Sequence, residues 1–195
     1  MRDLSDFVRR LVEVLDGLGL RYMFVGSAAS TLHGPPRSTQ DIDLVVALTL
    51  EDVQRLVVAF PNDSYYVSAE AARDAVLRRY SFNIIDLESG WKADIMVLRA
   101  RPFSQKEFER RQQADVFGTS SWVATAEDTI LAKLEWSQLA GGSERQREDV
   151  LGILEAQWEQ LDRVYLEHWA SELGIRSALD RALAAFGERR GESTD

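Results

Sequence analysis

The stretch that decides the fold is Arg37-Ser38-Thr39-Gln40-Asp41-Ile42-Asp43-Leu44-Val45-Val46, preceded by the small-residue turn Gly26-Ser27. In a β-strand alternate side chains share a face, so Asp41 and Asp43 point to one side and Ile42 to the other. Two carboxylates about 4 Å apart repel each other by roughly 4 kcal/mol at an effective dielectric constant of 20. A cation or a shared proton must compensate such a pair, and Mg²⁺ binds carboxylate oxygens together with substrate phosphates. The pattern therefore predicts a metal-dependent site for phosphoryl or nucleotidyl transfer.

The apolar run after the second aspartate distinguishes this pair from an ordinary turn. Most Asp-x-Asp sequences belong to solvated turns or helix caps, where short polar side chains bond the local backbone. Here Leu44, Val45 and Val46 follow directly. The two carboxylates are therefore expected at the mouth of a buried strand.

Composition sets the size of the protein and excludes several kinds of site. A chain of 195 residues can bury about 70% of its extended surface, which predicts one domain or one domain with a helical appendage. It has no cysteine and two histidines, which excludes disulfides, thiol catalysis and Cys-based zinc sites and makes a histidine-rich metal centre improbable. No apolar run approaches the roughly 18 residues of a membrane span, and the first residues are charged, so we expect a cytoplasmic protein without a membrane partner.

The charge of the chain bears on nucleic-acid binding. A formal net charge of −9 argues against broad, sequence-independent binding, because that depends on neutralising phosphates. The net charge does not exclude a local basic groove. Five basic residues lie close together in the sequence: Arg99, Arg101, Lys106, Arg110 and Arg111. Such a cluster is more often the solvated face of a helix.

Hydrophobic periodicity divides the chain into a mixed half, to about residue 124, and a helical half. In the first half we expect helices over 6–18, 28–33, 50–60, 68–79 and 104–114, and strands over 22–25, 41–48, 82–87, 92–98 and 121–123. Beyond Thr125, which begins a helix rich in early acidic residues, the sequence is helical to about residue 187. The polar tail, 188–195, is expected to be flexible.

A site with two metal ions usually needs a third carboxylate from another strand. Asp94, in Lys92-Ala93-Asp94-Ile95-Met96-Val97-Leu98, enters an apolar strand as Asp41 and Asp43 do. Asp86, in Ile84-Ile85-Asp86-Leu87, is the rival. Alternation along one strand does not decide between the two.

Together these motifs resemble the polymerase-β-type nucleotidyltransferase superfamily: a helix, a strand ending in Gly-Ser, an Arg-x-Thr-x-Asp-x-Asp strand, and a later strand with one Asp. Within it, Phe24-Val25-Gly26-Ser27-Ala28-Ala29 with Leu32-His33-Gly34 is similar to the abortive-infection (AbiE-type) toxin nucleotidyltransferases and related bacterial proteins. The helical half is suggestive of the same group through Glu127-Asp128 with Lys133, and Arg147-Glu148-Asp149. The resemblance covers most of the chain, and its Gly-Ser and Asp-x-Asp part is the more specific.

The resemblance implies a fold and a set of roles. The fold would be α+β, with a mixed sheet flanked by helices over 1–124 and a helical region over 125–187 packing against that core. Asp41, Asp43 and Asp94 would be the catalytic residues and the ligands of two Mg²⁺ ions, with Mn²⁺ as a substitute. Nucleotide contacts would come from Gly26, Ser27, Arg37, Thr39 and Lys133. For Lys133 a solvated surface lysine is an equal alternative, and His33 is expected to be structural.

The implied activity is transfer of a nucleoside monophosphate from an NTP to an acceptor hydroxyl. The acceptor could be tRNA, a protein or a small molecule, and a toxin acting on a tRNA 3′ end would come with an antitoxin protein. The first rival is a catalytically silent member of the same fold that binds a nucleotide or a protein partner. A metal-dependent hydrolase ranks last, because no second cluster of His and Asp supports it.

Overall fold

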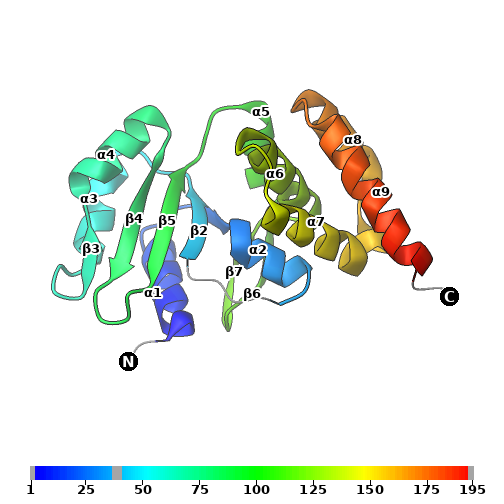
Figure 1. The fold of residues 1–195 in the computed structure, drawn as a ribbon. Helices are drawn as coiled ribbons and strands as arrows, with labels where there is room; N and C mark the ends of the chain where they lie inside the picture. The colour runs from blue at the N-terminus through cyan, green and yellow to red at the C-terminus, as the bar shows by residue number, and fades with distance from the viewer. Residues whose placement is uncertain (1–2, 37–40, 193–195) are drawn as a thin grey trace. The chain divides into compact units, whose positions relative to one another are not determined.

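The computed structural model describes residues 3–36 and 41–192 (Figure 1). The chain divides into two compact units. Unit 1 takes Met1–Ala28 and Ser38–Ala124, and unit 2 takes Ala29–Arg37 and Thr125–Asp195. The division falls inside helix α2 (Gly26–His33). None of the helices in the described part of the chain is long and apolar enough to cross a membrane.

Unit 1 is built on a seven-stranded mixed sheet in the order β3-β4-β5-β2-β1-β7-β6 (Figure 1). Its strands are β1 (Tyr22–Phe24), β2 (Asp41–Val46), β3 (Tyr65–Val67), β4 (Ser81–Asp86), β5 (Lys92–Val97), β6 (Gln112–Val116) and β7 (Thr119–Val123). Strands β2 and β5 pair in parallel at the centre, and β1 pairs with β2 antiparallel. The mixed sheet confirms the predicted fold class.

One face of this sheet is apolar and carries the main core of unit 1. Alternate residues of the central strands, among them Phe24, Leu44 and Ile95, are completely buried. Three helices pack with one another and with the strands on this side: α1 (Leu4–Gly17), α3 (Leu50–Ala59) and α4 (Ala69–Arg78). Capping boxes at Asp3 and Thr49 start α1 and α3, because each box satisfies backbone amides that the first turn leaves unbonded.

The opposite face is apolar only toward the ends of β2 and β5. There Phe108, from α5 (Pro102–Arg110), packs with Met23 and Val25, and Val45 and Met96 lie against the same cluster. Nearer the beginnings of β2 and β5 this face carries polar side chains. The polar part is the place where the predicted site falls.

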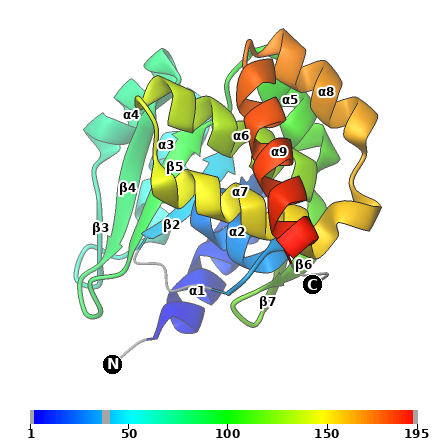
Figure 2. The ribbon, with the colours of Figure 1, turned by 45° about the vertical axis from the view of Figure 1, so that its right-hand side comes forward.

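Unit 2 is helical. Its helices after Thr125 are α6 (Ala126–Leu139), α7 (Glu144–Gln157), a 3-10 turn (Trp158–Gln160), α8 (Arg163–Glu172) and α9 (Arg176–Glu192). Helices α7 and α9 lie side by side in both ribbon views (Figure 2). Gly152 lets α7 approach the segment after α2, because a Cβ at this position would lie 2.5 Å from Cδ of Pro35.

Three local expectations differ from the structure. The helix expected to reach residue 114 ends at Arg110, and Gln112–Val116 forms strand β6, because its register with β7 satisfies the backbone of both strands. Strand β3, only three residues long, was not expected; it pairs with β4 at the sheet edge. Helix α9 continues past Gly187 to Glu192, where the sequence suggested a flexible tail.

Candidate active site

Three carboxylates lie on one face of the sheet of unit 1. Asp41 and Asp43 are two residues apart on β2 and therefore share a face. In the parallel pairing of β2 with β5, Asp43 is directly opposite Asp94, so Asp94 belongs to the same face. The pairing places the three aspartates predicted for catalysis together.

Asp86, the rival third carboxylate, lies on the other face. Asn83 of β4 is opposite Asp94, so Asp86, an odd number of residues further along the strand, points the opposite way. Its side chain is fully buried, and Oδ1 accepts hydrogen bonds from the backbone amides of Glu88 at 2.9 Å and Ser89 at 3.4 Å. Asp86 therefore orders the turn between β4 and β5.

A lysine that the sequence reading did not single out stands among the three carboxylates. Lys92 is opposite Asp41 in the β2–β5 register. Its Nζ lies 3.4 Å from Oδ1 of Asp41 and 3.3 Å from both carboxylate oxygens of Asp94. Among residues 3–36 and 41–192 no three His, Asp or Glu side chains are grouped closely enough to hold a metal ion as they stand. The ammonium group of Lys92 brings positive charge to Asp41 and Asp94.

Opposing effects act on the protonation of Lys92. Partial burial alone would lower the pKa of Lys92, but the hydrogen bond and charge of Asp94, together with the charge of Asp41, outweigh it and raise the pKa above its ordinary value. Lys92 therefore carries a full positive charge at neutral pH.

Asp94 has a second donor on the neighbouring strand. The side-chain amide of Asn83 donates to Oδ1 of Asp94, as the direct cross-strand register allows. Asn83 and Lys92 are thus two site residues that sequence reasoning missed. The alternation of β5 could have found Lys92, two residues before Asp94, whereas Asn83 could be found only from the register of β4 with β5.

Gly26 brings the beginning of α2 against Asp43. Its φ is +57°, a left-handed conformation that glycine adopts without strain. A Cβ at this position would lie 2.9 Å from Cγ of Asp43, so no other residue fits without displacing the carboxylate. The backbone amide of Val25 donates to the carbonyl oxygen of Asp43 at 3.0 Å. Gly26 and the half-buried Ser27 therefore begin a helix beside the acidic face.

The other residues predicted to contact a nucleotide are placed differently. Lys133, on α6 in unit 2, is buried and donates to Asp149 Oδ2 at 2.6 Å and Gln146 Oε1 at 2.9 Å. It is thus neither solvated nor on the sheet of unit 1. Arg37 and Thr39 lie outside the described residues.

Part of the basic stretch predicted as a solvated face or local groove is engaged inside unit 1. The guanidinium of Arg111 lies 4.5 Å from the ring centre of Phe108 and 4.9 Å from that of Trp122, and it donates to the carbonyl of Phe108 at 2.6 Å. Burial, and then the charge of Arg21, lower the pKa of Arg111. Arg101 donates to Ser104 Oγ at 2.8 Å. Lys106 is exposed on α5.

Comparisons with known proteins define the class of this fold. No protein-family model matches the chain, and no curated protein matches it by sequence. Among solved structures, an antigenic nucleotidyltransferase-like protein from Paracoccidioides brasiliensis has a TM-score of 0.55 at 18% identity, over 93% of this chain and 92% of its own. Antibiotic-resistance factor ANT(2'')-Ia has a TM-score of 0.52 at 13% identity, over 96% of this chain and 97% of its own.

A third structure, the lincosamide antibiotic adenylyltransferase LnuA with lincomycin bound, has a TM-score of 0.51 at 10% identity, over 78% of this chain and 96% of its own. At such identities the likeness establishes the fold alone. The chain has the α+β nucleotidyltransferase fold, a mixed sheet flanked by helices and followed in the sequence by further helices. The resemblance to the abortive-infection toxins stays a prediction.

Proposed function

We propose that this protein is a Mg²⁺-dependent nucleotidyltransferase that moves a nucleoside monophosphate from an NTP to an acceptor hydroxyl. One observation carries the proposal: Asp41, Asp43 and Asp94 share one face of the sheet, with Asp43 and Asp94 opposite each other and Gly26 packed against Asp43. This arrangement occurs in a nucleotidyltransferase fold. Like charges placed together destabilise a sheet, and a bound cation would offset this repulsion.

The donor set fits a hard divalent ion. Carboxylate oxygens are the ligands that Mg²⁺ prefers, and an ammonium already stands within 3.4 Å of two of the three carboxylates, which shows that this face accommodates positive charge. We assign Asp41, Asp43 and Asp94 as the ligands, with Mn²⁺ as a substitute ion. When bound, two such ions would neutralise triphosphate charge and favour in-line attack.

The residues of the chain take the remaining roles. The acceptor oxygen forms a bond to the α-phosphorus, the bond from that phosphorus to the bridging oxygen breaks, and pyrophosphate leaves. Asp94 accepts the proton of the acceptor hydroxyl. The backbone amides of Gly26 and Ser27 bind phosphate oxygens at the positive end of α2. Arg37, Thr39 and Lys133 stay predicted nucleotide contacts.

Asp43→Asn tests the proposal, because it removes one ligand charge without changing side-chain shape. We expect the variant to keep its fold and to lose Mg²⁺-dependent NTP binding, measured by isothermal titration. Transfer from an α-³²P-labelled NTP should fall by a factor of about a thousand, in the range found for essential catalytic groups. Asp86→Asn is the matched control, since an Asn oxygen can still accept the turn hydrogen bonds of Glu88 and Ser89. Near-full activity of purified Asp43→Asn would refute the metal assignment.

Two acceptor classes are to be compared in that assay. Two of the three similar structures are an antibiotic-resistance factor and a lincosamide adenylyltransferase, and the net charge of −9 disfavours a large RNA footprint. We therefore place a small-molecule hydroxyl first. Labelling of a tRNA 3′ end, with growth arrest that Asp43→Asn abolishes, would instead support a toxin with an antitoxin partner. Tight NTP binding without transfer to any acceptor would support the catalytically silent alternative.

A further inference from the structure

The ammonium of Lys92 is placed where it neutralises two of the three carboxylates at once. Its Nζ is 3.4 Å from Asp41 on the neighbouring strand and 3.3 Å from Asp94 on its own strand. Asp41 and Asp94 are also two of the three assigned metal ligands. The lysine and a divalent ion would therefore draw on the same oxygen atoms.

The contacts of the Lys92 ammonium are weak enough for another cation to displace it. The side chains of Lys92, Asp41 and Asp94 are 35%, 51% and 30% exposed, and pairs with this much exposure are weak because water screens them. Distances of 3.3–3.4 Å are also longer than the roughly 2.7–2.9 Å of strong charge-assisted hydrogen bonds. A divalent ion, with twice the charge and no side-chain entropy to lose, would compete well against these contacts.

The choice of lysine at this position is unusual for this chain. The sequence holds 23 basic residues, of which three are lysines (Lys92, Lys106 and Lys133), so 23 − 3 = 20 are arginines. Arginine would hold carboxylates with a rigid, bidentate fork, whereas the ammonium of lysine is a compact charge on a flexible stem. The acidic face thus carries the basic side chain that is more easily displaced.

We propose that Lys92 is a built-in counter-cation, which holds Asp41 and Asp94 until a divalent ion displaces it and which then turns its ammonium to the phosphates of the bound nucleotide. This inference rests on the proposed function, because it uses the same carboxylates as ligands. It assigns to Lys92 a positioning role that controls how tightly the acidic face binds its ion.

Isothermal titration of Mn²⁺ into the full chain, without nucleotide, tests this role. Lys92→Met removes the competing charge and should bind Mn²⁺ about tenfold more tightly than the wild type, the size expected from losing two partly exposed ion pairs. Lys92→Arg, with its fork on the carboxylates, should bind more weakly than the wild type. Lys106→Met, an exposed lysine on α5, is the matched control and should leave the affinity unchanged.

Thermal unfolding gives a second readout that does not depend on activity. In EDTA, Lys92→Met should melt below the wild type, because the positive charge that offsets the repulsion between Asp41 and Asp94 is then gone. At the same Mn²⁺ concentration its melting temperature should rise by more than that of the wild type, since stabilisation by a ligand grows with the logarithm of its concentration divided by its dissociation constant.

The failures of the two proposals can be told apart. Equal Mn²⁺ affinities for wild type, Lys92→Met and Lys92→Arg would overturn the role of Lys92 and leave the metal site standing. Absence of Mn²⁺ binding in every variant, Lys92→Met included, would overturn the metal site and the role of Lys92 with it.

Discussion

Two lysines of this chain pair with aspartates, and they differ in nearly every physical respect. Lys92 in unit 1 is 35% exposed and touches two carboxylates at 3.3–3.4 Å. Lys133 in unit 2 is 6% exposed, and its Nζ is 2.6 Å from one carboxylate, Asp149, which is 7% exposed. Gln146 accepts a further hydrogen bond from Lys133 at 2.9 Å. The contacts of Lys92 are long and solvent-exposed, whereas the Lys133–Asp149 ion pair is short and buried.

The difference in burial between the two sets of contacts separates a structural ion pair from one that can exchange its cation. A buried charge must stay paired, because leaving it alone in the interior costs several kcal/mol. Lys133 and Asp149 therefore hold α6 against α7. A half-exposed charge can give up its partner to another cation at little cost, so the acidic face of unit 1 can exchange Lys92 for an ion. Burial, rather than residue type, decides which pair can exchange its partner at little cost.

The largest predicted effect on stability comes from breaking the buried pair. Lys133→Met should lower the free energy of unfolding by about 3–5 kcal/mol, because it removes the ammonium that pairs with the buried carboxylate of Asp149. Lys92→Met should cost less than about 1 kcal/mol in the same urea titration, as expected for exposed pairs. Similar losses for the two variants would show that burial does not set the strength of these two ion pairs.

A double variant sharpens the same test. In Lys133→Met/Asp149→Leu both charges are replaced by apolar groups, and such replacements of buried pairs are often neutral. The double variant should therefore recover most of the stability that Lys133→Met loses. If it does not, the loss in Lys133→Met arises from packing and not from the charge of the Asp149 carboxylate.

Much of unit 1 could be predicted from the sequence, because strand alternation and turn residues are local signals. Alternation placed Asp41 and Asp43 on one face, and the apolar run after Asp94 predicted its strand. The choice between Asp94 and Asp86 could not be made in that way, since it depends on the register of β4 with β5. The register is set by pairing between strands that are separate in sequence.

The expectations that the structure contradicts also depend on pairing between segments that are separate in sequence. The helix expected over 104–114 overlaps the beginning of β6, because this polar segment lacks a clear alternation and only its pairing with β7 makes it a strand. The pairing of Lys133 with Asp149 joins residues on two helices, so a sequence pattern could not distinguish it from a solvated lysine. Long-range contacts decide what local propensity leaves open.

The second largest predicted effect on stability concerns Tyr22, on the apolar face of the sheet, opposite the face that carries the three aspartates. Tyr22 is 1% exposed, and burial, with a further contribution from Asp16, raises its pKa to about 12. An unfolded tyrosine has a pKa of about 10. The neutral, buried phenol therefore contributes stability that is fully present below pH 10 and is lost as the pH rises toward 12.

Tyr22→Phe removes this titration. Between pH 9 and pH 12 the wild type should lose about 2 kcal/mol more of its free energy of unfolding than Tyr22→Phe does, from a shift of about two pKa units. Urea titrations at several pH values would measure the difference. Tyr80→Phe is the matched control, because Tyr80 is 68% exposed, and it should follow the wild type. Parallel curves for wild type and Tyr22→Phe would show that Tyr22 ionises at the same pH in the folded and unfolded states, which would refute the raised pKa.

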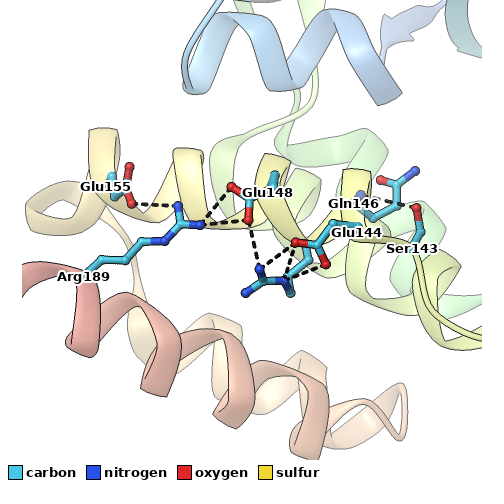
Figure 3. Close-up of polar contacts among 7 residues, drawn as sticks. Ser143, Glu144, Gln146, Glu148, Glu155 and Arg189 are labelled. Atoms are coloured by element: carbon cyan, nitrogen blue, oxygen red, sulfur yellow. Dashed lines mark hydrogen bonds and ion pairs between the residues drawn. The ribbon is translucent and has the colours of Figure 1, made fainter.

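The smallest predicted effect comes from the surface ion pairs of unit 2, which are exposed like Lys92 but have no assigned binding role. Arg189 of α9 lies 2.8 Å from Glu148 and 3.2 Å from Glu155, both on α7 (Figure 3). The three side chains are 39%, 46% and 42% exposed, so solvent and salt screen them.

Arg189→Met should therefore lower the free energy of unfolding by only about 0.5–1 kcal/mol at low salt. Arg181→Met, an exposed arginine on the same helix, is the control for helix propensity and charge number. In 1 M NaCl the difference between the two variants should vanish, because the screening length falls to about 3 Å. A salt-independent loss for Arg189→Met would mean that its aliphatic stem, rather than its charge, holds α9 to α7. The contrast between exposed and buried pairs would then need packing as well as solvation to explain it.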